Sequence, residues 1–480
     1  MKKPFLLIFV LLPMLAVANL VPVQHKNGKW GFKESENSEQ FVIKPQFAQV
    51  GQFVNGHAFV WEKGSYLWGV INTNGKFVIT PQYRSVEHIA NNRYVVLSDN
   101  GKKGVFNLSE CRDVISAKYD DVIAFKSGEY LLKMGDHCYV VDASGNVKYN
   151  VALPLPNNLF AVLSDKWEFM NTDGEMVEQP GNTLLYTSKD NEIVSASRSF
   201  RNDYFWKTNV VSDVCYANQG LTVFDKPLTS IGKYAFWCFD RLVSVSIPRG
   251  VTEVAESAFA YCSSLVKITI PDSVTSIGAS AFYNCISLTG ITFPGRVKSI
   301  GNRAFENCTS LAGITTSSGI TSIGGFAFSG CTSLTSVTVS DSVASIDAFL
   351  SGWCKINFDG YLANPFCYGA RLYHNGSELT DIVIPHDVAE IKSYAFYGCA
   401  SLERVTIGNS VTSIGGSAFK NCTALKTVYC NPTEPPILGF GVFDCDKGSI
   451  RRDIYVPSNS HSKYRFADGW INYVNSIHAY

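Results

Sequence analysis

The cysteines are the residues of this chain whose type and spacing could most readily do chemistry. The sequence has 14 of them, and seven form a series in which neighbours lie 23 residues apart within each of two runs. The series is Cys262, Cys285, Cys308, Cys331 and Cys354, followed by Cys399 and Cys422. A thiol can form a disulfide, bind a metal ion as the thiolate, or act as a nucleophile. Each role needs a particular geometry, which the spacing can test.

Disulfides between members of the series are disfavoured by distance. If each cysteine has the same place in successive stacked coils, equivalent side chains lie about 4.8 Å apart. A disulfide needs its two Cβ atoms at roughly 3.8 Å. Cys238 is displaced by one place from the series, and Cys138 belongs to the front half. Five further cysteines have no place in the series, and one pair among them could be bridged. These are Cys111, Cys215, Cys367, Cys430 and Cys445.

A metal site and a nucleophilic thiol are also disfavoured. Zinc needs four converging ligands, often in close pairs along the chain, but the sequence has no Cys-x-x-Cys. His137 and Cys138 are adjacent, and adjacent residues of a strand point to opposite faces. A catalytic thiol is one cysteine beside a histidine, whereas these thiols recur in repeats without histidine. The chain also lacks suggestively paired carboxylates and a phosphate-binding loop, so we expect no catalytic residue, cofactor or metal ion.

The elements that position the cysteines follow from the same period. Isoleucine, phenylalanine and leucine recur every 23 residues with the cysteine. Apolar and polar residues alternate in "LVKITIP" (265–271), which predicts a strand; a turn, a second short strand and an Ala-Phe corner follow. One such coil cannot bury its own inner face, so coils must stack and the ends need caps. The cysteine is then best interpreted as a small buried residue between phenylalanine and leucine.

The repeat pattern "IGxxAFxxCxSLxxVxIPxSV" resembles the BspA-type leucine-rich repeats of bacterial surface proteins, over about residues 231–475. The segment 455–477 resembles the end piece of that family, and its Tyr464, Trp470 and Tyr473 would cover the last coil. The resemblance implies a leucine-rich-repeat solenoid and adhesion to host matrix proteins or to other cells.

The front half has a different repeat. Asn27-Gly28, Asn74-Gly75 and Asn100-Gly101 are strong hairpin signals, and Trp30-Gly31 and Trp68-Gly69 begin equivalent strands. These residues resemble the WG-repeat family. We therefore expect a mainly β protein, whose front half is an array of β-hairpins, propeller-like or solenoid.

The sequence predicts seven segments. They are a signal peptide (1–18), a WG-repeat-like β domain (19–177), a connection with one strand (178–225), leucine-rich repeats (226–346), an irregular insertion with a hairpin (347–390), further repeats (391–445) and a cap (446–480). The first has Lys2 and Lys3, an apolar run and the small-x-small site Ala16-Val17-Ala18. We expect export, so the protein would be extracellular, on the cell surface or periplasmic.

Charge and hydropathy limit the classes of partner that the chain is expected to bind. Basic and acidic residues are equal, 41 of each, so the chain shows no electrostatic footprint for nucleic acid. No segment after the signal is apolar for long enough to span a bilayer, so we expect no membrane insertion after cleavage. A protein or glycan is the expected partner.

Outward side chains of the repeats are the candidate binding residues. On the strand face these are Lys267, Thr269, Thr292, Thr315, Thr338, Arg404 and Thr406. In the insertion they are the aromatic residues Trp353, Tyr361, Phe366, Tyr368 and Tyr373. The face residues could instead be solvated β-formers, and the insertion a degenerate coil whose aromatics fill its own gap. The sequence predicts a non-enzymatic binding protein; the alternative is an envelope scaffold without a host ligand.

Overall fold

A computed structural model describes residues 20–62, 64–189, 210–340, 345–446 and 452–480. The chain divides into two compact units, Met1–Glu178 and Gln179–Tyr480. The predicted signal peptide lies outside the described residues.

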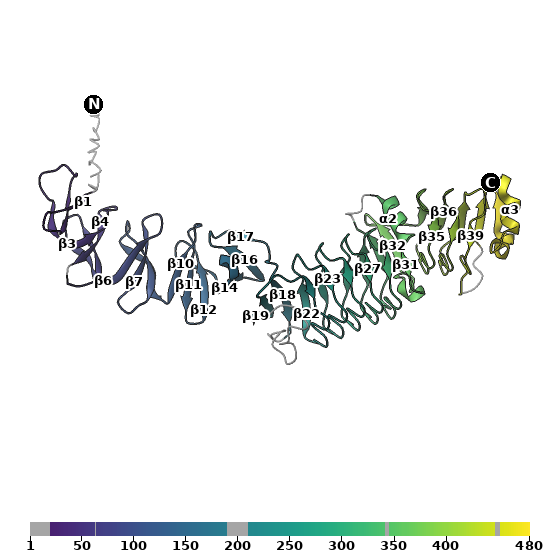
Figure 1. Ribbon diagram of the computed structural model, residues 1–480, viewed down its shortest axis with the longest axis horizontal. Coiled ribbons are helices and arrows are strands. Elements are labelled where there is room, and N and C mark those ends of the chain that lie inside the picture. Colours follow the sequence, from purple (N-terminus) through teal and green to yellow (C-terminus); the bar gives the residue numbers. More distant parts are fainter. Residues whose placement is uncertain (1–19, 63, 190–209, 341–344, 447–451) are drawn as a thin grey trace, which may run out of the picture. The chain divides into compact units, whose positions relative to one another are not determined.

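The N-terminal unit is an antiparallel meander in which strand order follows the chain (Figure 1). Its first sheet has nine strands: β1 (Val21–Gln24), β2 (Trp30–Lys33), β3 (Ile43–Val50), β4 (His57–Glu62), β5 (Trp68–Asn72), β6 (Phe77–His88), β7 (Arg93–Ser98), β8 (Lys103–Asn107) and β9 (Arg112–Tyr119). The second comprises β10 (Asp121–Ala124), β11 (Tyr130–Met134), β12 (His137–Val141) and β13 (Val147–Tyr149). The third comprises β14 (Val151–Leu155), β15 (Leu159–Leu163), β16 (Trp167–Asn171) and β17 (Met176–Val177), with the 3-10 turn η1 (Pro156–Asn158) between its first two strands. Within residues 20–62 and 64–178, no strand pairing joins β17 to β1, so the array is not closed by strand pairing.

Glycine has two separate tasks in this unit. At the hairpin turns, Gly28, Gly75, Gly101, Gly145 and Gly174 adopt φ between 76° and 88°, a conformation in which a Cβ is strained. The glycine of each Trp-Gly pair instead lies under the following strand. A Cβ there would approach a carbonyl oxygen of that strand to 2.5 Å at Gly31, 2.8 Å at Gly69 and 2.5 Å at Gly104. The third copy therefore keeps the glycine although Lys103 replaces its tryptophan.

The C-terminal unit is a stack of coils that build two ladders of strands (Figure 1). The long strands are β22 (Leu242–Ser246), β24 (Lys267–Thr269), β26 (Gly290–Thr292), β28 (Gly313–Thr316), β30 (Ser336–Val339), β32 (Arg371–His374), β34 (Asp381–Val383), β36 (Arg404–Ile407), β38 (Thr427–Cys430), β40 (Asp453–Val456) and β41 (Ile477–Ala479). The short strands are β21 (Ser230–Ile231), β23 (Glu253–Val254), β25 (Ser276–Ile277), β27 (Ser299–Ile300), β29 (Ser322–Ile323), β31 (Asn357–Phe358), β35 (Glu390–Ile391), β37 (Ser413–Ile414) and β39 (Ile437–Leu438). Pairing within these ladders is parallel and joins residues 23 apart in the regular coils, for example Ser244 with Lys267 and Ile277 with Ile300. The leucine-rich-repeat solenoid of 23-residue coils is thus confirmed.

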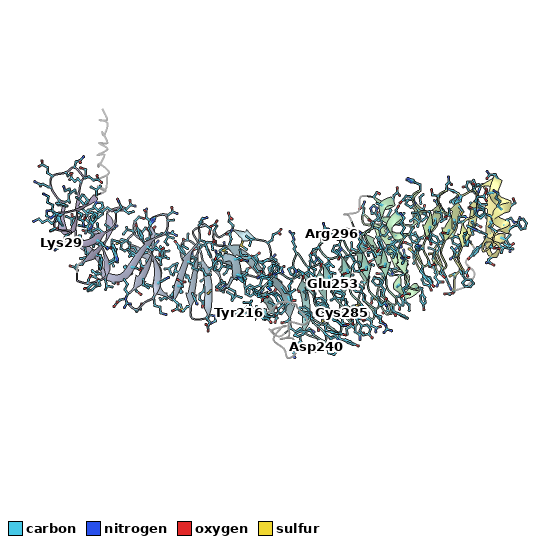
Figure 2. The ribbon with its side chains drawn as sticks, in the orientation of Figure 1. Lys29, Tyr216, Asp240, Glu253, Cys285 and Arg296 are labelled. Carbon is cyan, nitrogen blue, oxygen red and sulfur yellow. The ribbon has the colours of Figure 1, made fainter. Side chains whose placement is uncertain are left out.

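The core of the unit consists of columns of identical side chains. From Phe236 to Phe328, ring centroids of neighbouring coils lie 4.9–5.5 Å apart and their planes differ by at most 9°. The isoleucine, cysteine and leucine columns run beside these rings in the same buried cluster. Figure 2 shows Asp240, after the corner, and Arg296, after a long strand, at opposite edges of the coils. Each inner position therefore meets its own copy in the next coil, which explains the strict period.

The segment 178–225, expected to be a connection with one strand, has three strands in its described residues, 178–189 and 210–225. They are β18 (Thr183–Ser188), β19 (Val210–Tyr216) and β20 (Gln219–Phe224). Strand β18 pairs antiparallel with β22 and places Leu184 and Tyr186 in the core. The Tyr186 ring packs over Gly220, where an added Cβ would lie 2.0 Å from it. These strands extend the sheet of β22 and β24, so they cap the first coil of the stack.

The opposite end is covered by the C-terminal segment. It contains η3 (Ser458–Ser460), α3 (His461–Phe466) and η4 (Trp470–Ser476). Tyr464 and Trp470 are fully buried, with ring centroids 4.7 Å apart. The Tyr464 hydroxyl donates to Pro432 O at 2.6 Å, and Trp470 Nε1 donates to Pro436 O at 2.7 Å. The polar atoms of the cap thus bond to the last coil while its rings close the core.

Candidate binding face

Two columns of outward side chains follow the long strands, and we call them the binding face. The first column is Ser244, Lys267, Gly290, Gly313, Ser336, Arg371, Asp381, Arg404, Thr427 and Asp453. The second is Ser246, Thr269, Thr292, Thr315, Thr338, Tyr373, Val383, Thr406, Tyr429, Tyr455 and His478. Residues two apart in a strand share a face, so each long strand from β22 to β40 supplies one residue to each column, and β41 supplies only His478.

The structure brings together the predicted face residues in two groups. Lys267, Thr269 and Thr292 are exposed, and Thr315 and Thr338 are half-buried in the next coils. Arg404 and Thr406 lie farther along, where Arg404 Nη1 contacts Asp381 Oδ2 at 2.8 Å. Arg371 Nη1 similarly contacts Glu378 Oε1 at 2.7 Å. Each arginine is therefore paired with a carboxylate, which weakens it as an anion-binding group.

A groove of about 320 Å³ lies in the part of the binding face that carries Lys267, Thr292, Thr315 and Thr338. It is lined by Lys267, Ile268, Thr289, Gly290, Ile291, Thr292, Gly313, Ile314, Thr315, Ser336 and Thr338. Four of the predicted candidates therefore share one concave site that crosses four coils. Sequence reasoning predicted these residues as a flat ladder and missed the hollow, although two glycines at outward strand positions were its signal.

The aromatic residues of segment 347–390 require a correction. Trp353 and Phe366 are fully buried, so they cannot contact a ligand. Trp353 ends the helix α2 (Ile346–Trp353), packs on Phe366 at 5.5 Å and donates from Nε1 to Ala395 O at 2.7 Å. The end of the helix lies beside the coil of β35, because Lys392 N donates to Cys354 O at 2.9 Å. The hydrophobic effect favours burial of these rings, which fill the interior of an enlarged coil.

The remaining three aromatic candidates are accessible but dispersed. Tyr361, in η2 (Tyr361–Ala363), is 46% exposed and packs on Tyr397. The hydroxyl of Tyr368 accepts a hydrogen bond from Gly330 N at 2.7 Å, which holds this ring away from the binding face. Tyr373 belongs to the second column, beside Thr338. It precedes the Asn375-Gly376 turn that joins β32 to β33 (Ser377–Glu378). Only Tyr373 of the five aromatic candidates thus lies on the binding face.

The far end of the face carries aromatic rings that the sequence did not single out. Tyr429 and Tyr455 stack at 5.2 Å, and His478 lies 5.4 Å beyond Tyr455. His478 Nε2 contacts Asp453 Oδ1 at 3.1 Å. The second column therefore changes from hydroxyl to aromatic groups along the stack.

The cysteine series is interior, and its thiols make an unpredicted contact. Cys262, Cys285, Cys308, Cys331 and Cys422 donate to a phenylalanine carbonyl of the preceding coil at 3.0–3.2 Å. Phe259 O, for example, also accepts from Cys262 N at 3.2 Å. Burial raises the pKa of the Cys399 thiol to about 11 and that of Cys354 to about 12. Such thiols stay protonated at neutral pH, which makes them poor nucleophiles and metal ligands.

Disulfides, metal sites and membrane-spanning helices are the other features that the sequence bears on. All 14 cysteines are free thiols, including Cys111, Cys215, Cys367, Cys430 and Cys445. The described part of the chain holds no cluster of three or more His, Cys, Asp or Glu side chains placed to bind a metal ion. Its helices are all too short or too polar to span a bilayer.

Comparison with known proteins agrees with the repeats. The BspA type leucine rich repeat region matches in six copies over residues 229–357 and 369–475, and the WG containing repeat matches residues 68–102. No curated protein matches the chain.

Solved structures of bacterial leucine-rich repeat proteins are similar to parts of the chain. The T. pallidum leucine rich repeat protein is 25% identical over 42% of this chain and 73% of its own, with a TM-score of 0.27. A leucine-rich repeat protein from Bacteroides ovatus is 22% identical over 59% of this chain and 84% of its own, with a TM-score of 0.28. A leucine rich cell surface protein from Faecalibacterium prausnitzii is 21% identical over 64% of this chain and 95% of its own, with a TM-score of 0.25. The repeats of the C-terminal unit are accordingly a BspA-type leucine-rich repeat region, and residues 68–102 of the N-terminal unit are a WG repeat.

Proposed function

We propose that the protein is an exported, non-enzymatic surface protein that binds a protein or glycan of a host or neighbouring cell through the binding face. The BspA-type repeats support this assignment. The observation that carries it is the groove, a concave site on a surface that is otherwise regular. Adhesion follows if the partner is fixed to another cell.

The face suits recognition because little of it must be ordered on binding. Its strands are held in register by parallel pairing, and their inner side chains are fully buried. Fixing a flexible side chain costs about 0.5–1.5 kcal/mol, and the short hydroxyl side chains of the second column lose little of this. The hydroxyl groups of Thr292, Thr315 and Thr338 make no hydrogen bond among the described residues, so they remain available to a ligand.

A pair of arginine substitutions tests the proposal. Thr315→Arg places a long cation in the groove, whereas Ser299→Arg places the same side chain on short strand β27, away from the binding face. Residues 19–480 of each variant are applied to host cells and to immobilised matrix proteins and glycans. We expect Thr315→Arg to lower binding at least tenfold and Ser299→Arg to leave it unchanged. Equal binding by both variants would exclude the face.

The envelope scaffold is the other outcome of this experiment. If the purified chain ignores every surface, while crosslinking in intact cells recovers envelope proteins, the scaffold replaces adhesion. Substitution is preferable to deleting residues 360–380, because that deletion removes β32 and the buried Phe366.

A further inference from the structure

We infer that the groove binds an acidic glycan, with a sugar carboxylate beside Lys267 and the sugar rings over Gly290 and Gly313. The inference rests on the proposed function and names the ligand of the same face.

The hollow is not a requirement of the fold. Gly290 and Gly313 are outside the left-handed region, where glycine is favoured. A Cβ on Gly290 would meet only Gly313 O, at the ordinary distance of 3.6 Å. A Cβ on Gly313 would meet the rotatable Ser336 Oγ at 2.7 Å. Side chains could therefore occupy both positions, as they do in every other residue of the first column.

The corner glycines of the same coils show the contrast. A Cβ on Gly278 would lie 2.6 Å from the Ala255 carbonyl carbon, and one on Gly301 would lie 2.5 Å from Ala279 N. Those glycines are needed for backbone packing. Since packing does not explain Gly290, the space it leaves open is the feature that needs a role.

The charge of the lining points to an anion. Lys267 is the one charged residue that lines the groove. Within the described residues it has no ion pair, unlike Arg371 and Arg404 on the same column. A single unneutralised ammonium beside a concave surface attracts an anionic group. One positive charge matches the low charge density of a carboxylated sugar better than that of a densely sulfated one.

The remaining lining chemistry favours a sugar over a peptide. Thr292, Thr315 and Thr338 present hydroxyls that can both donate and accept, as the hydroxyls of a glycan do. A peptide strand needs a free sheet edge, but β28 lies between β26 and β30. Strand β26 pairs with β28 on one side, and on the other side Thr289 N, just before β26, donates to Val266 O of the preceding coil at 3.3 Å. The lining also offers no pocket walled by large apolar side chains, which a peptide hot spot would fill.

Calorimetric titration of the full chain with trigalacturonate tests the inference, and neutral galactotriose and triglutamate serve as comparison ligands. We expect trigalacturonate to bind, with an affinity that falls as salt is raised, and the other two to bind at least tenfold more weakly. Lys267→Gln should weaken trigalacturonate binding about tenfold or more, since it removes a charge-assisted hydrogen bond. Gly290→Thr should abolish binding by filling the groove.

Two control variants separate local from general effects. Lys298→Gln removes an exposed cation beside short strand β27. Gly295→Thr adds the same side chain as Gly290→Thr at a position outside the groove and outside both columns, where a Cβ would meet nothing within 4 Å. Both should bind trigalacturonate like the original chain, with unchanged melting temperatures.

Each contrary result has its own meaning. Equal affinity for galactotriose would overturn the role of Lys267, and preference for triglutamate would overturn the glycan in favour of an acidic peptide. Absence of trigalacturonate binding would overturn the inference, while cell binding sensitive to Thr315→Arg would leave the proposed function standing.

Discussion

As pH is raised, the C-terminal unit should unfold at an unusually low alkaline pH, because its core holds many thiols. Eight cysteines of this unit are buried: Cys262, Cys285, Cys308, Cys331, Cys354, Cys399, Cys422 and Cys430. Burial raises the pKa of each above its ordinary value of 9.0. Thiols of the unfolded chain therefore release protons at a pH where those of the folded unit do not.

The sign and the size of the effect follow from this difference. A raised folded-state pKa gives stability that is complete below pH 9 and is lost as pH rises toward the folded-state value. Each thiol lowers the free energy of unfolding by about 1.4 kcal/mol per pH unit in this window, so eight together give about 11 kcal/mol per pH unit. Domain stabilities are about 5–15 kcal/mol, so we expect unfolding near pH 10.

Urea unfolding of the full chain between pH 7 and pH 10, in a reducing buffer and followed by circular dichroism, measures this slope. The double variant Cys285→Ala with Cys308→Ala should lower the slope by about 2.7 kcal/mol per pH unit. Cys238→Ala is the matched control, because the Cys238 side chain is exposed. A free energy of unfolding that stays constant from pH 8 to pH 10 would refute the burial of the thiols.

Three further predictions concern packing. In native protein at pH 7, iodoacetamide should label Cys238 and spare Cys285, as read by mass spectrometry; equal labelling would contradict the interior series. Gly104→Ala should destabilise the N-terminal unit by about 2–3 kcal/mol in calorimetry, because its Cβ would meet a carbonyl at 2.5 Å, whereas Gly290→Ala should change stability by less than about 0.5 kcal/mol. Trp470→Ala should cost about 3–5 kcal/mol and speed amide exchange in β38 and β40, and unchanged exchange would show that the cap is dispensable.

Much of the C-terminal unit could be predicted because stacking makes equivalent positions meet identical surroundings. Phe282 and Cys285 reveal their burial by recurring in every coil. Strand alternation similarly assigned Thr292 and Thr315 to the outer face. Periodicity carries no information where it breaks, so Trp353 could not be distinguished from an exposed aromatic residue.

The remaining features depend on contacts that one sequence does not encode locally. Strand β18 is antiparallel and occurs once, so no repeat marks it as a cap. The bond from the Cys285 thiol to Phe259 O depends on the offset between neighbouring coils. Gly290 was visible as an outward residue, but only the surrounding backbone shows that a side chain would fit there.

A crystal structure of the full chain soaked with trigalacturonate tests recognition by the outer face most directly. The account predicts a carboxylate next to Lys267 Nζ, with sugar rings over Gly290 and hydroxyls bonded to Thr292 and Thr315. Sugar bound on the short-strand ladder, or a groove that stays empty at saturating ligand, would contradict it.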